Sequence, residues 1–168
     1  MKTPEKAFYE SPLGLIEIAA SDRGITALSF ASPSKAPRSK TSGRAFPPPL
    51  LAEAVRELAE YFSGERREFT VRLDLRGTPF ELTVWRALLE VPFGRTISYG
   101  ELGRSVGKPD AARAVGGANH RNPVSIIIPC HRVVGADGGL TGYGGGLWRK
   151  KWLLEHEGAL PSNAGLMV

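Results

Sequence analysis

The first third of the chain alternates hydrophobic and polar positions in short runs, a pattern typical of a small sheet. Residues 8–14 and 15–20 read as two strands around a turn, and residues 25–30 as a third strand. Residues 69–75 alternate in the same way and predict a further strand of this sheet. Between them, apolar residues recur at helical spacing over residues 50–62, with Gly64 as a stop, which predicts a core-packing helix. Its apolar face consists of Leu51, Ala54, Val55, Leu58, Ala59 and Phe62.

Helical signals dominate from residue 77 onward. Thr78-Pro79-Phe80-Glu81 is a capping box with proline at the first helical position, which predicts a helix through Leu89. A second capping box, Ser98-Tyr99-Gly100-Glu101, predicts a short helix over residues 99–106 that Gly107 closes. Residues 108–110 are expected to start another helix through Val115, so the two short helices form a helix-turn-helix candidate. The helix that runs through Leu89 should turn Phe80, Val84, Ala87 and Leu88 inward, with Trp85 also in the core.

A different pattern, an aliphatic run, precedes the single cysteine of the chain. Residues 124–128 are β-branched except for Ser125 and predict a buried strand. Pro129 lacks a backbone donor, so the strand cannot simply continue and Cys130 is expected at a strand end or bend. Since neighbours in an extended segment point to opposite faces, a water bridging Cys130 and His131 is an easier geometry than direct contact. A lone cysteine is more often a small buried hydrophobe than a nucleophile, so its surroundings must decide.

These elements predict an α/β (α+β) protein in two parts. Residues 1–76 form a small α/β scaffold, and residues 77–168 form a mostly helical domain with the helix-turn-helix and the cysteine. A length of 168 residues suits one ordinary domain or two small ones. Residues 31–49 are rich in Ser, Pro, Lys and Arg and predict a loop or linker.

Composition and charge limit the cellular compartment and the kinds of partner that we expect for the protein. One cysteine excludes an internal disulfide and a zinc-type cysteine cluster, which fits a reducing compartment. The first residues lack the apolar core of a signal peptide, and no run is long enough to span a bilayer. We therefore expect a cytoplasmic protein, or a nuclear one in a eukaryote, with no membrane partner. The net charge of +5 favours a polyanionic partner, although the basic residues are spread along the chain.

The residues around the cysteine overturn the interpretation as a buried hydrophobe. Pro129-Cys130-His131-Arg132-Val133-Val134 resembles the active-site signature of the O6-alkylguanine-DNA alkyltransferase family, which is Pro-Cys-His-Arg followed by two aliphatic residues. Further motifs match in the same order, and the resemblance covers most of residues 50–158. They are Ala111-Ala112-Arg113-Ala114-Val115-Gly116-Gly117-Ala118, Asn122-Pro123, Tyr143-Gly144-Gly145-Gly146-Leu147 and Trp152-Leu153-Leu154-Glu155-His156-Glu157-Gly158. The resemblance implies a ribonuclease-H-like N-terminal part.

The resemblance also implies the chemistry. Cys130 would accept the alkyl group of O6-alkylguanine in double-stranded DNA, and O4-alkylthymine would be a further substrate. A thiol has a reference pKa of about 8.5, so a base is needed, and the resemblance assigns this to His131 acting through water and oriented by Glu157. Tyr99 would donate a proton toward guanine N3, and Asn122 would hold the turn that leads to the cysteine. No second cysteine could restore the thiol, so we expect one turnover, no cofactor and no metal, by a monomer.

Four further residues would bind the flipped base. By resemblance, a backbone N–H near Gly144 would contact O6, and the carbonyls of Cys130 and Val133 would accept from the exocyclic amine. Tyr143 and Gly145 complete this substrate pocket. Gly144 departs from the serine found there in some relatives, so a hydroxyl contact is absent. Residues 135–146 are rich in glycine but lack the lysine and hydroxyl of a nucleotide P-loop, and a flexible lid fits them better.

The helix before the cysteine is lined with small residues. They are Ala111, Ala112, Ala114, Gly116, Gly117 and Ala118. Glycine inside a helix costs about 1 kcal/mol against alanine, so close packing on the cysteine strand or insertion into a DNA groove should offset that cost. By resemblance, Arg113 would occupy the space left by the extruded base, with Ala112, Ala114 and Gly116 beside the DNA. Composition alone makes Arg113 a solvated surface charge.

Two other classes of protein remain as alternatives. A helix-turn-helix regulator without catalytic activity does not require a cysteine and a histidine beside its recognition element. A cysteine hydrolase would need a base in direct hydrogen-bond reach of the sulfur and repeated turnover.

Overall fold

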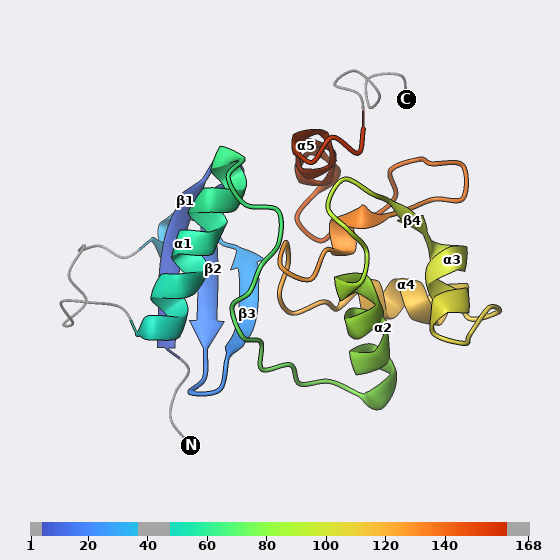
Figure 1. The fold of residues 1–168 in the computed structure, drawn as a ribbon, viewed down its shortest axis with the longest axis horizontal. Coiled ribbons are helices and arrows are strands. Elements are labelled where there is room, and N and C mark those ends of the chain that lie inside the picture. The colour runs from blue at the N-terminus through green and yellow to red at the C-terminus, as the bar shows by residue number, and fades with distance from the viewer. Residues whose placement is uncertain (1–4, 37–47, 161–168) are drawn as a thin grey trace. The chain divides into compact units, whose positions relative to one another are not determined.

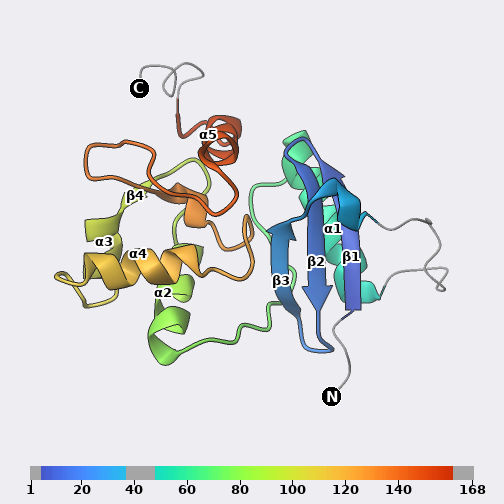
Figure 2. The same ribbon diagram turned by 180° about the vertical axis from the view of Figure 1, so that it is seen from behind.

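The computed structural model describes residues 5–36 and 48–160. The chain divides into two compact units, Met1–Arg76 and Gly77–Val168, and each is described by itself (Figures 1 and 2). The loop expected over residues 31–49 lies largely outside the described residues. Its beginning forms a short 3-10 helix, Pro33–Lys35, and its last residue already starts a helix.

In the described residues of the N-terminal unit, a three-stranded antiparallel sheet is covered by the helix α1 (Figure 1). The strands are β1 (Glu5–Ser11), β2 (Gly14–Ala20) and β3 (Ile25–Phe30), in the order β1-β2-β3, so the three expected N-terminal strands are confirmed. Helix α1 (Pro49–Ser63) ends at Gly64, whose φ of 87° suits glycine, also as predicted. The core between sheet and helix is aliphatic and includes Ile16, Ile18, Leu28, Leu51 and Leu58.

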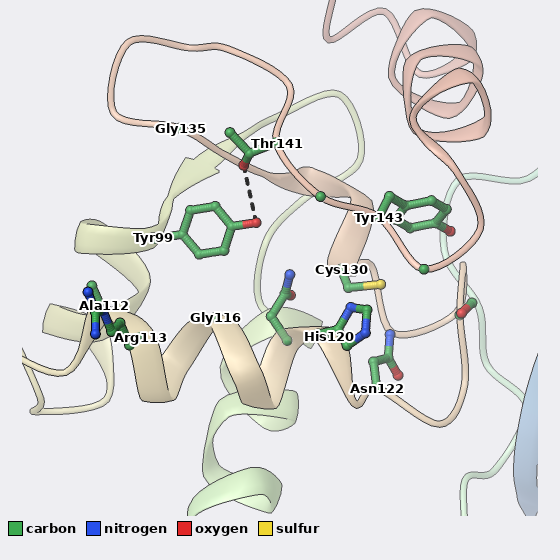
Figure 3. Close-up of a pocket in the computed structure, with 14 residues that line it drawn as sticks. Tyr99, Ala112, Arg113, Gly116, His120, Asn122, Cys130, Gly135, Thr141 and Tyr143 are labelled. Atoms are coloured by element: carbon green, nitrogen blue, oxygen red, sulfur yellow. Dashed lines mark hydrogen bonds between the residues drawn. The ribbon is translucent and has the colours of Figure 1, made fainter.

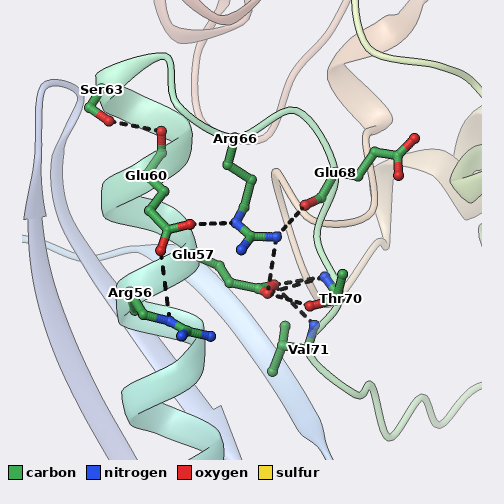
Figure 4. A network of polar contacts seen from close by, with 8 residues as sticks. All are labelled: Arg56, Glu57, Glu60, Ser63, Arg66, Glu68, Thr70 and Val71. Carbon is green, nitrogen blue, oxygen red and sulfur yellow. Dashed lines mark hydrogen bonds and ion pairs between the residues drawn. The ribbon is translucent and has the colours of Figure 1, made fainter.

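The buried face of α1 differs from the predicted one by a charged residue. Ala59 is exposed, whereas Glu57 and Tyr61 are fully buried. The Glu57 carboxylate accepts hydrogen bonds from the backbone N–H of Thr70 at 2.7 Å and of Val71 at 3.0 Å, and from the Thr70 hydroxyl at 2.9 Å (Figure 4). Arg66 lies 3.7 Å away as a counter-charge. These donors make burial of the carboxylate tolerable and fix residues 70–71 to the helix.

The strand predicted over residues 69–75 is wrong. This segment touches β3 through a single parallel bridge, Ile25 to Leu73, with Ile25 N–H donating to Arg72 O and Asp74 N–H donating to Ile25 O. Two of its amide groups bond to Glu57 instead of to a neighbouring strand, so a regular ladder cannot form along it.

Over residues 77–160, the described part of the C-terminal unit, four α-helices surround a two-stranded parallel sheet (Figure 2). In chain order its elements are α2 (Pro79–Leu89), β4 (Ile97–Ser98), α3 (Tyr99–Ser105), α4 (Ala112–His120), η2 (Cys130–Arg132), β5 (Val133–Val134) and α5 (Leu147–His156). Both predicted capping boxes are present, with Thr78 and Glu81 on α2 and Ser98 and Glu101 on α3.

Helix α2 supplies the packing centre of this unit. Val84, Trp85 and Leu88 are buried, while the expected core residues Phe80 and Ala87 are only half-buried. The Trp85 indole N–H donates to the Ala118 carbonyl of α4 at 2.8 Å, so the tryptophan is core, as predicted, and ties the two helices together.

Helices α3 and α4 and the turn between them form the predicted helix-turn-helix arrangement (Figure 2). A side chain at Gly103 would lie 2.9 Å from the Lys108 carbonyl, so this turn needs glycine for close approach. Helix α4 begins at Ala112 rather than at residues 108–110, and it continues beyond Val115 to His120. The N-cap residue of α4 is Ala111, which has no side chain that could cap the helix. The sequence therefore carries no capping signal at the true start of α4.

Candidate active site

The cysteine is presented by a tight turn, not by the strand predicted over residues 124–128. Ile127 N–H donates to Ser125 O, Ile128 N–H to Val124 O and Cys130 N–H to Ile128 O, which closes the backbone on itself. Ile126 has a φ of 72°, a left-handed conformation that is rare for a β-branched residue. Such strain persists only where the surroundings over-determine the conformation, and here Val124, Ile126 and Ile128 are all buried.

Asn122 holds this turn with its side chain. Its amide nitrogen donates to the Ile128 carbonyl at 2.7 Å, and its amide oxygen accepts from the Val124 N–H at 2.9 Å. The two bonds bracket the turn from both ends, so Asn122 sets the position of the backbone that enters Cys130.

Cys130 and His131 lie on the 3-10 helix η2 rather than on an extended segment, which corrects the expected geometry. The next residues form β5, which pairs in parallel with β4 in the register Ile97 to Val133 and Ser98 to Val134. Because α3 begins directly after β4, this pairing brings Tyr99 to the same region as the cysteine.

A buried polar cluster stands behind the cysteine. The His131 Nε2 atom lies 2.8 Å from Glu157 Oε2, and the Arg132 guanidinium donates to both oxygens of Glu157, from Nε at 2.8 Å and from Nη2 at 3.0 Å. Arg132 Nη1 also donates to the Val91 carbonyl at 2.7 Å. The Glu157 and His131 side chains are fully buried. Among the described residues, no hydrogen-bond partner reaches the buried Nδ1 atom of His131.

The protonation states follow from burial and from this cluster. Burial raises the pKa of the Cys130 thiol, with smaller opposing effects from Asn122 and the charge of Lys150. Burial lowers the pKa of His131, although Glu157 opposes the shift. The pKa of Glu157 is lowered despite burial, because His131 and Arg132 donate hydrogen bonds to the carboxylate and Arg132 carries the opposite charge. The resting state therefore combines a neutral thiol, a neutral imidazole and an ionised carboxylate.

A cavity of about 560 Å³ opens above the cysteine. Figure 3 shows α4 along one side of it and the loop after β5 along the other, with Tyr99 and the Cys130 sulfur between them. The Thr141 hydroxyl of the loop donates to the Tyr99 hydroxyl at 3.3 Å across the cavity. A Cβ atom at Gly116 would lie 3.8 Å from the Tyr99 ring, an ordinary van der Waals distance, so this position faces the ring without requiring glycine. Helix α4 packs on helices α2 and α3, not on a cysteine strand.

Both units of the chain are similar in sequence to domains of one known protein family. Residues 5–75 match the ribonuclease-like domain of 6-O-methylguanine DNA methyltransferase, and residues 79–159 match the DNA-binding domain of the same family. The methylated-DNA–protein-cysteine methyltransferase of Mycolicibacterium paratuberculosis is 51% identical over 148 residues, 88% of each chain. The chain belongs to the 6-O-methylguanine DNA methyltransferase family.

Other members of this family are similar to this chain over nearly its whole length. The methylated-DNA–protein-cysteine methyltransferase of Methanosarcina acetivorans is 46% identical over 91% of this chain and 97% of its own. The crystal structure of the Mycobacterium tuberculosis O6-methylguanine methyltransferase is similar with a TM-score of 0.79, at 44% identity, over 99% of this chain and 100% of that one. A structure of Mycobacterium tuberculosis OGT in complex with DNA has a TM-score of 0.78 at 45% identity and covers 96% and 99% of the two chains. The predicted family and the two-part α/β fold are thereby confirmed.

The structure brings together most of the residues that the family resemblance singled out. The cavity lining includes Tyr99, Ala112, Arg113, Gly116, Asn122, Cys130, Tyr143 and Gly144. His131 and Glu157 are buried and do not line it. Val133 is fully buried in β5, Ala114 is exposed on α4, and Gly145 lies in the loop, so these three predicted residues also lie outside the lining.

Sequence reasoning assigned no site role to several residues that the structure places at or near the cavity. Asn119, His120, Ser125 and Thr141 line the cavity. Arg132 and Lys150 are buried charges next to the cysteine segment. A signal for Lys150 was present, because it precedes the buried pair Leu153 and Leu154 by three and four residues and so lies on the apolar face of α5.

Within residues 5–36 and 48–160, His, Cys, Asp and Glu side chains do not gather in any group of three that could hold a metal ion. The helices of the same residues include none with the length and apolar character needed to cross a bilayer.

Proposed function

We propose that the protein repairs DNA by direct reversal, taking the alkyl group of O6-alkylguanine in duplex DNA onto Cys130. The observation that carries this proposal is the placement of the single cysteine in a cavity, with a His131–Glu157 pair buried beside it. The relatives are methylated-DNA–protein-cysteine methyltransferases, and one family structure is a complex with DNA. O4-alkylthymine is the second substrate that we propose.

The hydrogen bonds of Glu157 define how His131 acts. An ionised carboxylate only accepts, so the hydrogen between the two residues belongs to His131 Nε2. In a neutral imidazole this leaves Nδ1 as the basic atom, and Nδ1 is the atom without a described partner. A water between Nδ1 and the Cys130 thiol would carry the proton away as the thiolate forms. Glu157 is thus a positioning residue that selects the tautomer and stabilises the imidazolium.

The transfer is a displacement at the alkyl carbon. The Cys130 thiolate forms the new sulfur–carbon bond, the bond from carbon to guanine O6 breaks, and its electron pair stays on the base. Tyr99 donates its phenol proton toward N3, and the backbone N–H at Gly144 donates to O6, which stabilises the departing guanine. The carbonyls of Cys130 and Val133 select guanine through its exocyclic amine. The product is a thioether, whose carbon–sulfur bond thiol–disulfide exchange does not open, so the Cys130 thiol is not regenerated.

A base stacked in a duplex cannot reach the cysteine, so the nucleotide must be flipped at a cost of a few kcal/mol. Helix α4 is the element that we assign to this step. Ala112, Arg113 and Ala114 are exposed on it, and Gly116 follows on the cavity side. Figure 3 places Arg113 at the N-terminal end of α4, away from Cys130, where it would fill the space that the base leaves. The unit Met1–Arg76 serves as scaffold, and the unit Gly77–Val168 binds DNA and accepts the alkyl group as a monomer.

Intact-protein mass spectrometry tests this function. After incubation with excess duplex containing one O6-methylguanine, we expect a gain of one methyl group that maps to Cys130 and stops at one per chain. Cys130→Ser should bind the duplex without any gain. A wild-type protein that binds the duplex and stays unmodified would contradict the proposal and indicate a damage-sensing binder.

A second measurement tests the mode of DNA binding. We expect affinity for the duplex to fall steeply with salt, because phosphate contacts by Lys and Arg release counterions. Arg113→Ala should slow methyl transfer more than it weakens DNA binding, because its assigned role is to stabilise the flipped state. Equal transfer rates for Arg113→Ala and wild type would refute that role.

A further inference from the structure

A buried lysine in α5 has no function in the mechanism described so far. Lys150 is fully buried, and its ammonium donates to the Thr141 carbonyl at 2.6 Å and lies 3.4 Å from the Gly142 carbonyl. Among the described residues, no carboxylate forms an ion pair with it. A buried cation held by carbonyls alone is costly, so something should compensate for it.

The group that can supply the missing negative charge is the reactive sulfur. Helix α5, which carries Lys150, packs directly on η2, which carries Cys130, and the charge of Lys150 opposes the effect of burial on the pKa of the Cys130 thiol. The second titratable group of η2 in the field of Lys150 is His131, which is neutral in the resting state. The facing loop contributes Tyr143, whose phenol stays protonated because burial raises its pKa well above the ordinary value. Cys130 is therefore the group that becomes an anion beside Lys150.

We propose that Lys150 is a positioning residue for alkyl transfer, which anchors the loop at Thr141 and Gly142 and provides the counter-charge for the Cys130 thiolate. This inference rests on the proposed function of Cys130. The loop anchor places Tyr143 and Gly144, the next residues along the chain, in the cavity wall. The same ammonium opposes the effect of burial on the thiol, so one side chain links the shape of the cavity to the reactivity of the sulfur.

The pH dependence of this pair has a defined sign. Burial lowers the pKa of Lys150 to about 8. Below that pH the ammonium is charged and favours the thiolate, and above it the charge is lost and further ionisation of Cys130 becomes harder. The two groups should titrate together, so thiolate formation is spread over a wider pH range than a single ionisation gives.

Reaction of the free protein with iodoacetamide tests the proposal without DNA, since Cys130 is the single thiol. We compare Lys150→Met, which keeps the length of the side chain, with Lys150→Arg, which keeps the charge. Lys151→Met is the matched control, because Lys151 is the adjacent residue and forms a partly exposed ion pair with Glu155. Lys150→Met should react about tenfold more slowly near neutral pH, equivalent to a rise of about one unit in the thiol pKa. Lys150→Arg should recover most of this loss, and Lys151→Met should equal wild type.

Methyl transfer in a single turnover should follow the same order among the variants. A folded Lys150→Met protein with the pH profile of wild type would overturn the proposal. If Lys150→Met does not fold, the wild-type profile decides: broadened thiolate formation supports the coupling, and a single sharp ionisation refutes it. Failure of the wild type to take up methyl would instead refute the proposed function and leave the iodoacetamide result intact.

Discussion

Replacing Glu157 with glutamine tests the buried cluster behind the cysteine. In a fully buried position, the carboxylate accepts hydrogen bonds from His131 and from two nitrogens of Arg132 at 2.8 to 3.0 Å, and a longer one from the Gly94 N–H at 3.5 Å. A glutamine keeps one acceptor oxygen and turns the other into a donor that faces a donor. The variant also leaves the Arg132 cation buried without its counter-charge. Breaking one side of a buried ion pair costs about 3–5 kcal/mol, so we expect a loss of that size in the free energy of unfolding.

The assay can be restricted to the unit that carries the cluster. The three tryptophans of the chain, Trp85, Trp148 and Trp152, all lie in the unit Gly77–Val168, so their fluorescence in urea follows that unit. Glu155→Gln is the matched control, because Glu155 pairs with Lys151 one helical turn away at 3.6 Å, with both side chains partly exposed, and such i,i+4 pairs contribute about 0–1 kcal/mol. A Glu157→Gln protein within 1 kcal/mol of this control would refute the ion-pair argument.

The pH dependence provides an independent readout of the same substitution. The folded pKa of Glu157 lies below its unfolded value of about 4.3, so its stabilisation is complete above that pH. It is lost progressively as the pH falls from there toward the depressed folded pKa. Wild type should therefore lose stability below about pH 4, and Glu157→Gln should lack that component. Single-turnover methyl transfer should also slow by about 10²–10⁴-fold, the usual contribution of a positioned general base.

Three further substitutions probe single hydrogen-bonded contacts. Asn122→Ala removes both hydrogen bonds that bracket the turn before the cysteine. It should lower the free energy of unfolding in urea by about 1–3 kcal/mol and slow methyl transfer. Unchanged transfer would contradict the role of the turn. Glu57→Gln should speed hydrogen exchange at the amides of Thr70 and Val71, and unchanged protection there would mean that the carboxylate does not hold them. Trp85→Phe loses the bond to the Ala118 carbonyl and should cost about 0.5–1.5 kcal/mol in urea unfolding, and no loss would show that this bond is not stabilising.

The elements that sequence predicted well have their determinants within a few residues of each other. The capping boxes at Thr78 and Ser98 join residues three positions apart, and they fix the starts of α2 and α3. Gly64 ends α1 through its own backbone conformation. The start of α4 was misplaced because Ala111 offers no capping side chain, so no local signal marks the boundary.

The candidate site was predictable in its residues and not in its geometry. Family resemblance supplied Cys130, His131, Glu157 and Tyr99, yet it supplied neither the 3-10 helix that carries the cysteine nor the register of β4 on β5. That register joins residues far apart in the chain. The hydrogen bonds that Arg132 donates to Glu157 were also not predicted, because the sequence shows Arg132 only as part of the motif around the cysteine.

The two strands that sequence predicted wrongly share one physical cause. Residues 69–75 and 124–128 have the alternation or the β-branched run of a strand, but in each a polar side chain from outside the segment binds its backbone, Glu57 in the first case and Asn122 in the second. A strand requires its amides and carbonyls for a partner strand, so a side chain that binds them removes the ladder. At Asn122 this competition leaves Ile126 with a φ of 72° and curls the backbone into the turn that presents Cys130. The position of the cysteine thus depends on an asparagine eight residues earlier, and the aliphatic run serves to bury and hold the turn rather than to extend a sheet.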